Sequence, residues 1–203
     1  MKLSQWFKQY LLLIAALVFT IATEAVSKEG SSATSFYSNF EELSFTDQDS
    51  HAYQIAKLSG KVTLFNFIYT QCSSVCPLQT KALQEIQQSL PPETGKDVQF
   101  ISVSLDPLND TPQKLNAYAK RMHADLNHWS FITGKPESIE KIANRLSLYG
   151  NPVLNKDKKV VRPNDHSTAL WLINRKGELM MRYSGNPLDT QRISKELTQL
   201  SKM

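Results

Sequence analysis

The stretch VTLFNFIYTQCSSVCP, residues 62–77, contains the strongest strand signal of the chain and the start of a helix. Its first half, Val62 to Tyr69, is apolar on both faces of an extended chain and rich in β-branched and aromatic side chains, which predicts a strand in the centre of a sheet covered on both sides. Pro77 suits the first turn of a helix, so the helix after the short loop is expected to start beside Cys76. Apolar residues continue this helix at the expected spacing: Leu78, Ala82, Ile86 and Leu90.

Outside this stretch, predicted strands alternate with predicted helices. The expected elements are a hairpin over 43–54, buried strands at 98–105 and 129–132, helices opening at Pro112 and Pro136, a hairpin of strands 168–173 and 179–183, and a last helix from Leu188. Alternation of this kind predicts an α/β three-layer sandwich, in which a central mixed sheet carries helices on both faces.

The composition excludes several classes of protein. The chain has 203 residues, of which 41% are hydrophobic and 21% charged, and this suits a single globular domain. Its two cysteines are too few for a disulfide-framework miniprotein or a four-cysteine zinc module. The net charge is +4, but the basic residues are spread along the chain rather than gathered in a stripe, so no nucleic-acid partner is expected.

The N-terminal segment concerns targeting rather than the fold. The apolar run LLLIAALVFTIA at 11–22 has the length of a signal-peptide core and is shorter than the ~20 residues of a membrane-spanning helix. We therefore expect a signal peptide or an N-terminal membrane anchor in residues 1–25, a Ser-rich linker in 26–39, and the folded domain in 40–203. Either alternative exports the domain, which in a bacterium lies in the periplasm or faces it from the inner membrane.

Cys72 and Cys76 are the candidates for chemistry. They lie between a central strand and a helix N-terminus, where sites of open α/β sheets gather and where the helix end stabilises a thiolate. Cysteines four residues apart near a helical turn lie about 6 Å apart at Cα, which suits a disulfide as well as a shared soft metal ion. Because they are the only two cysteines and occur in one loop, a purely structural role as buried small side chains is disfavoured. The pair alone leaves electron transfer and metal binding open.

A third ligand would decide between these uses. His51, His123 and His128 lie in polar turns or connections and are expected at the surface, whereas His166 directly precedes a buried strand. If that strand packs beside 62–69, the His166 imidazole could reach both sulfurs. Two thiolates and one imidazole form a soft ligand set that suits Cu(I), with Cu(II) accommodated through the nitrogen donor and a small solvent ligand.

Several blocks of the sequence together resemble the SCO/SenC family. They are Asn66 to Pro77, Val103 to Pro107, Asp110-Thr-Pro112, Asp165-His166-Ser167 and Trp171 to Gly177, in the family's order, and the likeness runs from about Phe40 to the C-terminus. The resemblance implies a thioredoxin-like fold and an exported or membrane-associated copper protein that assists assembly of the dinuclear copper site of cytochrome c oxidase. Cys72, Cys76 and His166 match the family's copper ligands. One departure is Ser73-Ser74, where the family usually has Pro-Asp.

The function expected from this resemblance is that of a metallochaperone rather than an enzyme. It would deliver copper to a copper-receiving subunit of cytochrome c oxidase or to another copper protein, with membrane association through its N-terminus. The alternative is a thiol-disulfide oxidoreductase, in which Cys72 and Cys76 are a redox-active pair that reduces cysteines of the copper-receiving partner. Three residues between the cysteines, rather than two, weaken this alternative, and the same spacing argues against a peroxidase.

Overall fold

The computed structural model describes residues 35–148 and 167–203. Within them, a mixed seven-stranded sheet has the order β2-β1-β5-β4-β3-β6-β7. Its strands are β1 (Phe45–Asp47), β2 (Ala52–Tyr53), β3 (Val62–Ile68), β4 (Val98–Ser104), β5 (Trp129–Gly134), β6 (Leu170–Ile173) and β7 (Leu179–Tyr183). All seven residues of β3 are buried, as expected for the central strand.

The pairing of the strands determines which loops share an edge of the sheet. β3, β4 and β5 are parallel to one another, so the loops that follow them lie at one edge. β6 is antiparallel to β3, with Phe65 opposite Trp171, so β6 begins at the edge where β3 ends. The strand predicted after His166 therefore packs beside the strand that leads to Cys72, which is the condition for the His166 imidazole to reach the sulfurs.

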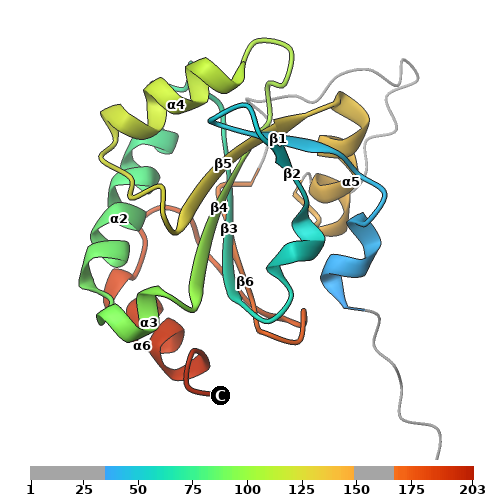
Figure 1. The fold of residues 1–203 in the computed structure, drawn as a ribbon. Coiled ribbons are helices and arrows are strands. Elements are labelled where there is room, and N and C mark those ends of the chain that lie inside the picture. The colour runs from blue at the N-terminus through green and yellow to red at the C-terminus, as the bar shows by residue number, and fades with distance from the viewer. Residues whose placement is uncertain (1–34, 149–166) are drawn as a thin grey trace, which may run out of the picture. The chain divides into compact units, whose positions relative to one another are not determined.

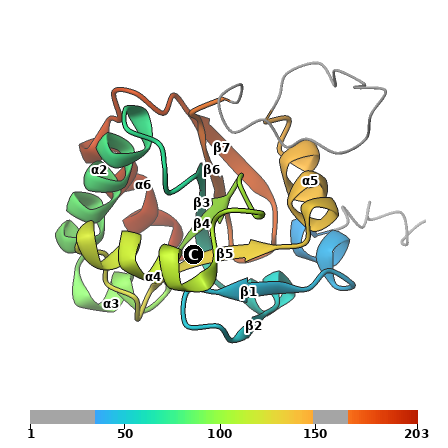
Figure 2. The ribbon, with the colours of Figure 1, turned by 90° about the horizontal axis from the view of Figure 1, so that it is seen from above.

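Helices cover both faces of the sheet, which confirms the predicted three-layer arrangement (Figures 1 and 2). The bounds of the helices are α2 (Val75–Ser89), α3 (Pro92–Gly95), α4 (Pro112–Arg121), α5 (Pro136–Arg145) and α6 (Thr190–Leu200), with 3₁₀ helices η1 (Phe36–Phe40) and η2 (Ile55–Leu58). α2, α4 and α6 lie on one face, and α5 and η1 on the other. α4 and α5 each begin with proline, whose missing N–H costs nothing at that position.

Alternate residues of β3 enter two separate hydrophobic clusters. Leu64 and Ile68 pack with the buried faces of α2, α4 and α6. Phe65 and Phe67 point to the other side, where they meet α5 and the two 3₁₀ helices. Both faces of the strand are therefore fully used for packing, which leaves its carboxyl end as the place for chemistry.

The folded part begins earlier than the predicted boundary at residue 40. Residues 36–39, assigned above to the linker, belong to η1, where Phe36 and Tyr37 are buried and the Tyr37 hydroxyl donates to Thr63 Oγ1 at 2.7 Å. The Ser-rich composition around them led to the prediction of a linker, although Phe36 and Tyr37 anchor this segment to the core. The predicted signal or anchor segment and the linker up to residue 34 lie outside the described residues. Among the helices of 35–148 and 167–203, none has the length and apolar character needed to cross a bilayer.

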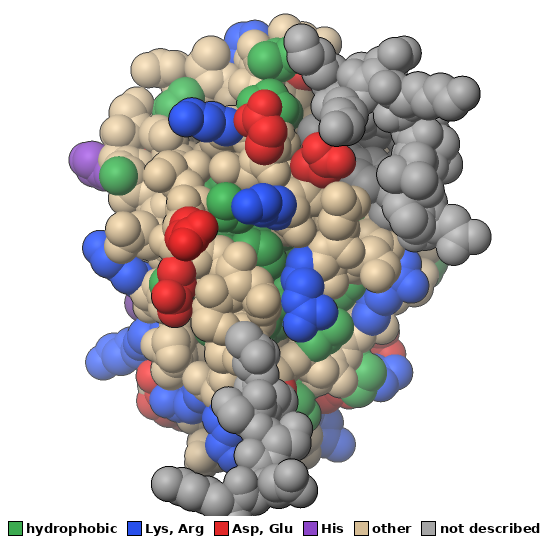
Figure 3. Space-filling view, turned by 90° about the vertical axis from the view of Figure 1, so that its right-hand side faces the viewer, with side chains coloured by type: hydrophobic (Ala, Val, Ile, Leu, Met, Phe, Trp, Pro, Cys, Tyr) green, Lys and Arg blue, Asp and Glu red, His purple; other side chains and the backbone are tan. Residues whose placement is uncertain are grey.

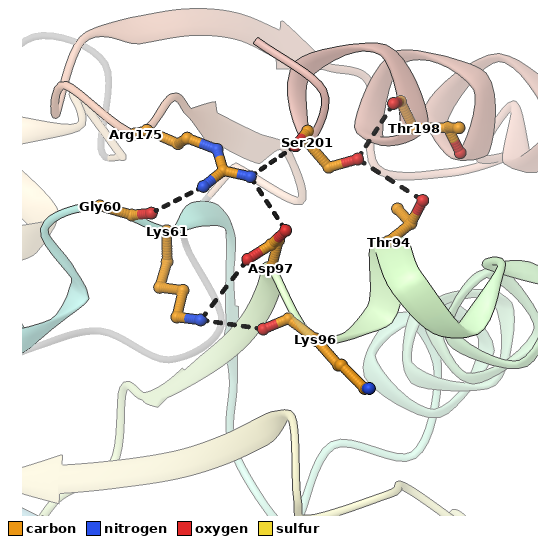
Figure 4. A network of polar contacts seen from close by, with 8 residues as sticks. All are labelled: Gly60, Lys61, Thr94, Lys96, Asp97, Arg175, Thr198 and Ser201. Atoms are coloured by element: carbon orange, nitrogen blue, oxygen red, sulfur yellow. Dashed lines mark hydrogen bonds and ion pairs between the residues drawn. The ribbon is translucent and has the colours of Figure 1, made fainter.

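Polar contacts tie together the edge of the sheet opposite the cysteine loop (Figure 4). Asp97, just before β4, pairs with Arg175 of the β6–β7 turn at 3.0 Å and with Lys61, just before β3, at 3.7 Å. Arg175 also donates to the carbonyl of Ser201 at the end of α6. These contacts join the starts of two central strands to the C-terminal helix, so this edge has a structural role.

Charged side chains of both signs are mixed on the face of the molecule seen in Figure 3. Lys and Arg lie among Asp and Glu, with hydrophobic side chains scattered between them. The described residues on this face form no patch of a single charge.

Candidate metal centre

Asp110 fixes the loop that leads from β3 to the cysteines. Its carboxylate is fully buried and accepts hydrogen bonds from the backbone N–H of Thr70 at 3.0 Å and from the Ser104 hydroxyl at 2.6 Å. The Thr70 hydroxyl donates to the other carboxylate oxygen of Asp110. The loops after β3 and β4 are thus held together two residues before Cys72, and the position of the first cysteine follows from that anchor.

Cys72 and Cys76 lie side by side at the start of α2. The backbone N–H of Cys76 donates to Cys72 Sγ at 3.4 Å, and the hydroxyl of Ser74 lies 3.9 Å from the same sulfur. Both cysteines are free thiols, with Cys72 8% exposed and Cys76 3% exposed. α2 begins at Val75, so the sequence correctly predicted that the helix starts beside Cys76. Ser74, one of the two residues that depart from the family's usual Pro-Asp, makes no side-chain cap for this helix.

The two thiols differ strongly in acidity. Burial opposes ionisation of Cys72, but hydrogen bonds from the Cys76 side chain, from the backbone of Ser74 and Cys76, and from the Tyr69 side chain outweigh it and lower the pKa of Cys72 from 9.0 to about 7. Burial and the neighbouring Cys72 raise the pKa of Cys76 to about 12. Above about pH 7 the pair therefore holds mainly one thiolate and one thiol, and a metal that binds both sulfurs must displace the proton of Cys76.

Three of the four histidines are described, and they lie away from the cysteines. His51 is 78% exposed in its side chain and lies 3.7 Å from Asp47 in the β1–β2 turn. His123 is exposed and His128 half-buried, and both precede β5, at the edge of the sheet opposite Cys72. Within the described ranges no cluster of three His, Cys, Asp or Glu side chains could hold a metal ion. His166, the predicted third ligand, lies outside the described residues.

The residues directly after His166 are described, and they contact the cysteine helix. The carbonyl of Thr168 accepts a hydrogen bond from Gln79 Nε2 at 2.6 Å, and Gln79 lies three residues after Cys76 on α2. The backbone N–H of Ser167 donates to the carbonyl of Leu148 at 3.0 Å. Residues 167 and 168 therefore lie at the edge of the sheet where β3 ends and the cysteine loop begins.

Sequence reasoning missed the supporting polar residues of this centre. Gln79 and Tyr69 gave no signal, because a single amide on a helix and a single tyrosine at a strand end are common in any α/β chain. Their partners are distant in sequence or fixed by the loop fold, so only the tertiary structure reveals them.

The chemistry of the donor set favours one class of metal. Two adjacent sulfurs, one of them with a pKa lowered to about 7, are soft ligands of the kind Cu(I) prefers. A closed structural zinc site would require four protein ligands.

Comparison with known proteins places the chain in a family. A family model described as SCO1/SenC matches residues 30–202. The SCO1 protein homolog of Bacillus subtilis is 30% identical over 152 residues, which are 71% of this chain and 73% of that protein.

Two solved structures have closely similar folds. ScoI of Bradyrhizobium japonicum with copper bound is 26% identical, with a TM-score of 0.63 over 78% of this chain and 96% of that one. BsSco, described with a disulfide switch and as a member of the Sco family of cytochrome c oxidase assembly proteins, is 26% identical, with a TM-score of 0.64 over 79% of this chain and 91% of its own.

These likenesses confirm the predicted thioredoxin-like α/β fold. The family model covers nearly the whole folded part, together with the cysteine pair and Asp165-His166-Ser167. The chain therefore belongs to the SCO1/SenC family, whose members are copper-binding proteins linked to the assembly of cytochrome c oxidase.

Proposed function

We propose that this protein carries Cu(I) on Cys72, Cys76 and His166 and delivers it to the dinuclear copper site of cytochrome c oxidase during assembly. Copper is the cargo here, and the acceptor is the oxidase subunit that receives it. The observation that carries the proposal is the hydrogen bond between Thr168 and Gln79, because it holds the residue two positions after His166 against α2, one turn after Cys76.

The asymmetry of the two thiols suits the release of cargo. Cys72 is the more accessible sulfur, and it is stable as a free thiolate when copper leaves, because several hydrogen bonds lower its pKa. Cys76 regains a proton on release, because its pKa is about 12. Reprotonation of Cys76 favours the departure of copper once an acceptor ligand has displaced one sulfur.

The same asymmetry favours a second candidate function, thiol-disulfide exchange with the acceptor. The Cys72 thiolate would attack one sulfur of an acceptor disulfide, form a mixed disulfide and release the other acceptor sulfur, which takes up a proton. Cys76 would then lose its proton and attack Cys72 Sγ, freeing the second acceptor thiol and leaving a Cys72–Cys76 disulfide. Two electrons pass to the acceptor, and a dithiol reductant must reset the pair.

We place the action of the protein outside the cytoplasm. Residues 1–25 supply a signal peptide or an N-terminal anchor, so the domain works in the periplasm or at its membrane face if the organism is bacterial. This location suits an acceptor site exposed on that side of the membrane.

A single mixing experiment separates the two functions. The full chain, reduced and loaded with Cu(I), is mixed with the soluble copper-receiving domain of the oxidase subunit, with the acceptor cysteines either reduced or joined in a disulfide. Copper delivery predicts transfer to the reduced acceptor, with transfer impaired by His166→Ala. Reduction of the oxidised acceptor without copper transfer would instead establish the exchange function and refute delivery.

A further inference from the structure

Gln79 is a buried amide whose hydrogen-bonding groups are all used. It is 4% exposed and lies on α2, one turn after Cys76. Its Oε1 accepts from Asn66 Nδ2 at 3.0 Å, and its Nε2 donates to the carbonyls of Thr168 at 2.6 Å and Gly185 at 3.3 Å. One side chain thus connects the cysteine helix to β3, to the start of β6 and to the chain after β7.

A chain of hydrogen bonds that begins at Trp129, in the middle of the sheet, determines the orientation of the Gln79 amide. Trp129 Nε1 can only donate, and it donates to Ser102 Oγ at 2.9 Å. Ser102 therefore uses its proton for Asn66 Oδ1, at 2.7 Å. The amide N–H of Asn66 then faces Gln79 Oε1, which leaves the N–H groups of Gln79 for the two carbonyls. All these side chains are at most 4% exposed, so the chain of donors has no solvent alternative.

The backbone of Gly185 and the carbonyl of Thr168, both bonded to Gln79, are packed tightly against each other. A Cβ atom at Gly185 would lie 1.3 Å from the Thr168 carbonyl oxygen, so this approach requires glycine. Ser167 is held as well, by its N–H bond to the Leu148 carbonyl and by Arg182, which donates to the Ser167 hydroxyl at 2.9 Å. The segment that directly follows His166 is therefore fixed to α2, the helix that includes Cys76 and begins three residues after Cys72.

We propose that Gln79 is a positioning residue of the copper centre, which sets the chain next to His166 at a fixed place relative to the two sulfurs. It touches neither copper nor the sulfurs and acts through the Thr168 carbonyl. The inference rests on the ligand set of the proposed function. Loss of residues that orient metal ligands typically lowers metal affinity about 10- to 100-fold.

The test compares Gln79→Met, which keeps the size of the side chain without its hydrogen bonds, with Thr80→Val as a matched control. Thr80 is the next residue on α2 and is also buried. Its hydroxyl bonds to the hydroxyl of Tyr118, which lies on α4, at 2.9 Å. Both variants are made in the full chain and in His166→Ala. Cu(I) affinity is measured on reduced protein by competition with a chromogenic Cu(I) chelator.

We expect Gln79→Met to weaken Cu(I) binding about tenfold when His166 is present and by less than about twofold in His166→Ala. Thr80→Val should change the affinity by less than about twofold in both backgrounds. The reduction potential of the Cys72–Cys76 couple should be the same in Gln79→Met as in the unmodified protein, since Gln79 does not contact the sulfurs. Gln79→Glu keeps the acceptor for Asn66 but offers no N–H to Thr168, so it should weaken binding as Gln79→Met does.

The outcomes separate this inference from the proposed function. Equal losses with and without His166, or no loss at all, would overturn the positioning role while leaving the copper ligands intact. Unchanged Cu(I) affinity in His166→Ala alone would refute the ligand set itself, and with it the inference that rests on it.

Discussion

The acidity of Cys72 depends on several hydrogen bonds, and removing the one from the Tyr69 side chain should slow the reaction of that thiol. The Tyr69 side chain bonds to the Cys72 sulfur, and this contact is one of four that together overcome the cost of burial. Tyr69→Phe deletes the hydroxyl and leaves the ring, which packs against the cluster below α2. Backbone geometry should persist, because the N–H of Cys72 bonds to the carbonyl of residue 69 rather than to its side chain.

The size of the effect follows from the free energy of one hydrogen bond to a charged sulfur. Such a bond contributes about 1.5–3 kcal/mol when buried and less when partly exposed, as at Tyr69. A loss of about 1.4 kcal/mol raises a pKa by one unit. Because the folded pKa is depressed to about 7, the thiolate is present above that pH and lost below it. In the variant the midpoint should move to about 8, so the thiolate fraction at pH 7 falls from about one half to about one tenth.

The assay is the rate of alkylation of the reduced, copper-free chain by iodoacetamide between pH 5 and pH 10, with the labelled cysteine identified by mass spectrometry. Cys72 should react first, with a midpoint near pH 7, and about fivefold more slowly at pH 7 in Tyr69→Phe. Tyr37→Phe, which removes a buried hydrogen bond to Thr63 on the other face, serves as the control and should leave the profile unchanged. A midpoint near pH 9 in the unmodified protein would show that Cys72 is not acidified, and an identical profile in Tyr69→Phe would show that the Tyr69 hydroxyl does not contribute.

Further predictions concern stability, measured by urea denaturation. Gly185→Ala should lower the free energy of unfolding by about 3 kcal/mol, because the added carbon would collide with the Thr168 carbonyl; wild-type stability would contradict the packing there. Phe36→Ala should lower the free energy of unfolding by about 3–4 kcal/mol, because this ring packs on Phe65. A negligible change would indicate that residues 36–39 are part of the linker. Asp110→Asn should cost about 2 kcal/mol by weakening the bonds from Thr70 and Ser104. Asp106→Asn, a half-buried control whose carboxylate accepts an exposed hydrogen bond from Asn109, should change stability by less than about 0.5 kcal/mol. An equal effect of the two Asp substitutions would contradict the anchoring role of Asp110.

The main elements of the fold were predictable because their signals are local. The predominantly apolar run from Val62, with apolar residues on both faces, predicts a central strand, and the prolines at 112 and 136 mark the starts of α4 and α5. η1 and α3 escaped prediction because helices this short show no periodicity. η1 in particular is defined by aromatic side chains that find their partners only in the tertiary structure.

The candidate site was predictable in part for the same reason. The two cysteines are four positions apart, and Pro77 follows the second of them. These local features were enough to predict a cysteine pair at the start of a helix. The contact between Gln79 and Thr168 spans 89 positions and depends on the antiparallel placement of β6 beside β3, which local patterns do not encode. The third ligand, His166, stays a prediction.

In the proposed centre, two sulfurs and one imidazole of this chain hold a single Cu(I) ion. The most direct measurement is X-ray absorption at the copper edge on the reduced full chain with one equivalent of Cu(I), compared with His166→Ala. We expect two sulfur neighbours and one nitrogen neighbour, and loss of the nitrogen alone in the variant. A copper environment that keeps its nitrogen in His166→Ala, or that contains no pair of sulfurs in the unmodified chain, would contradict it.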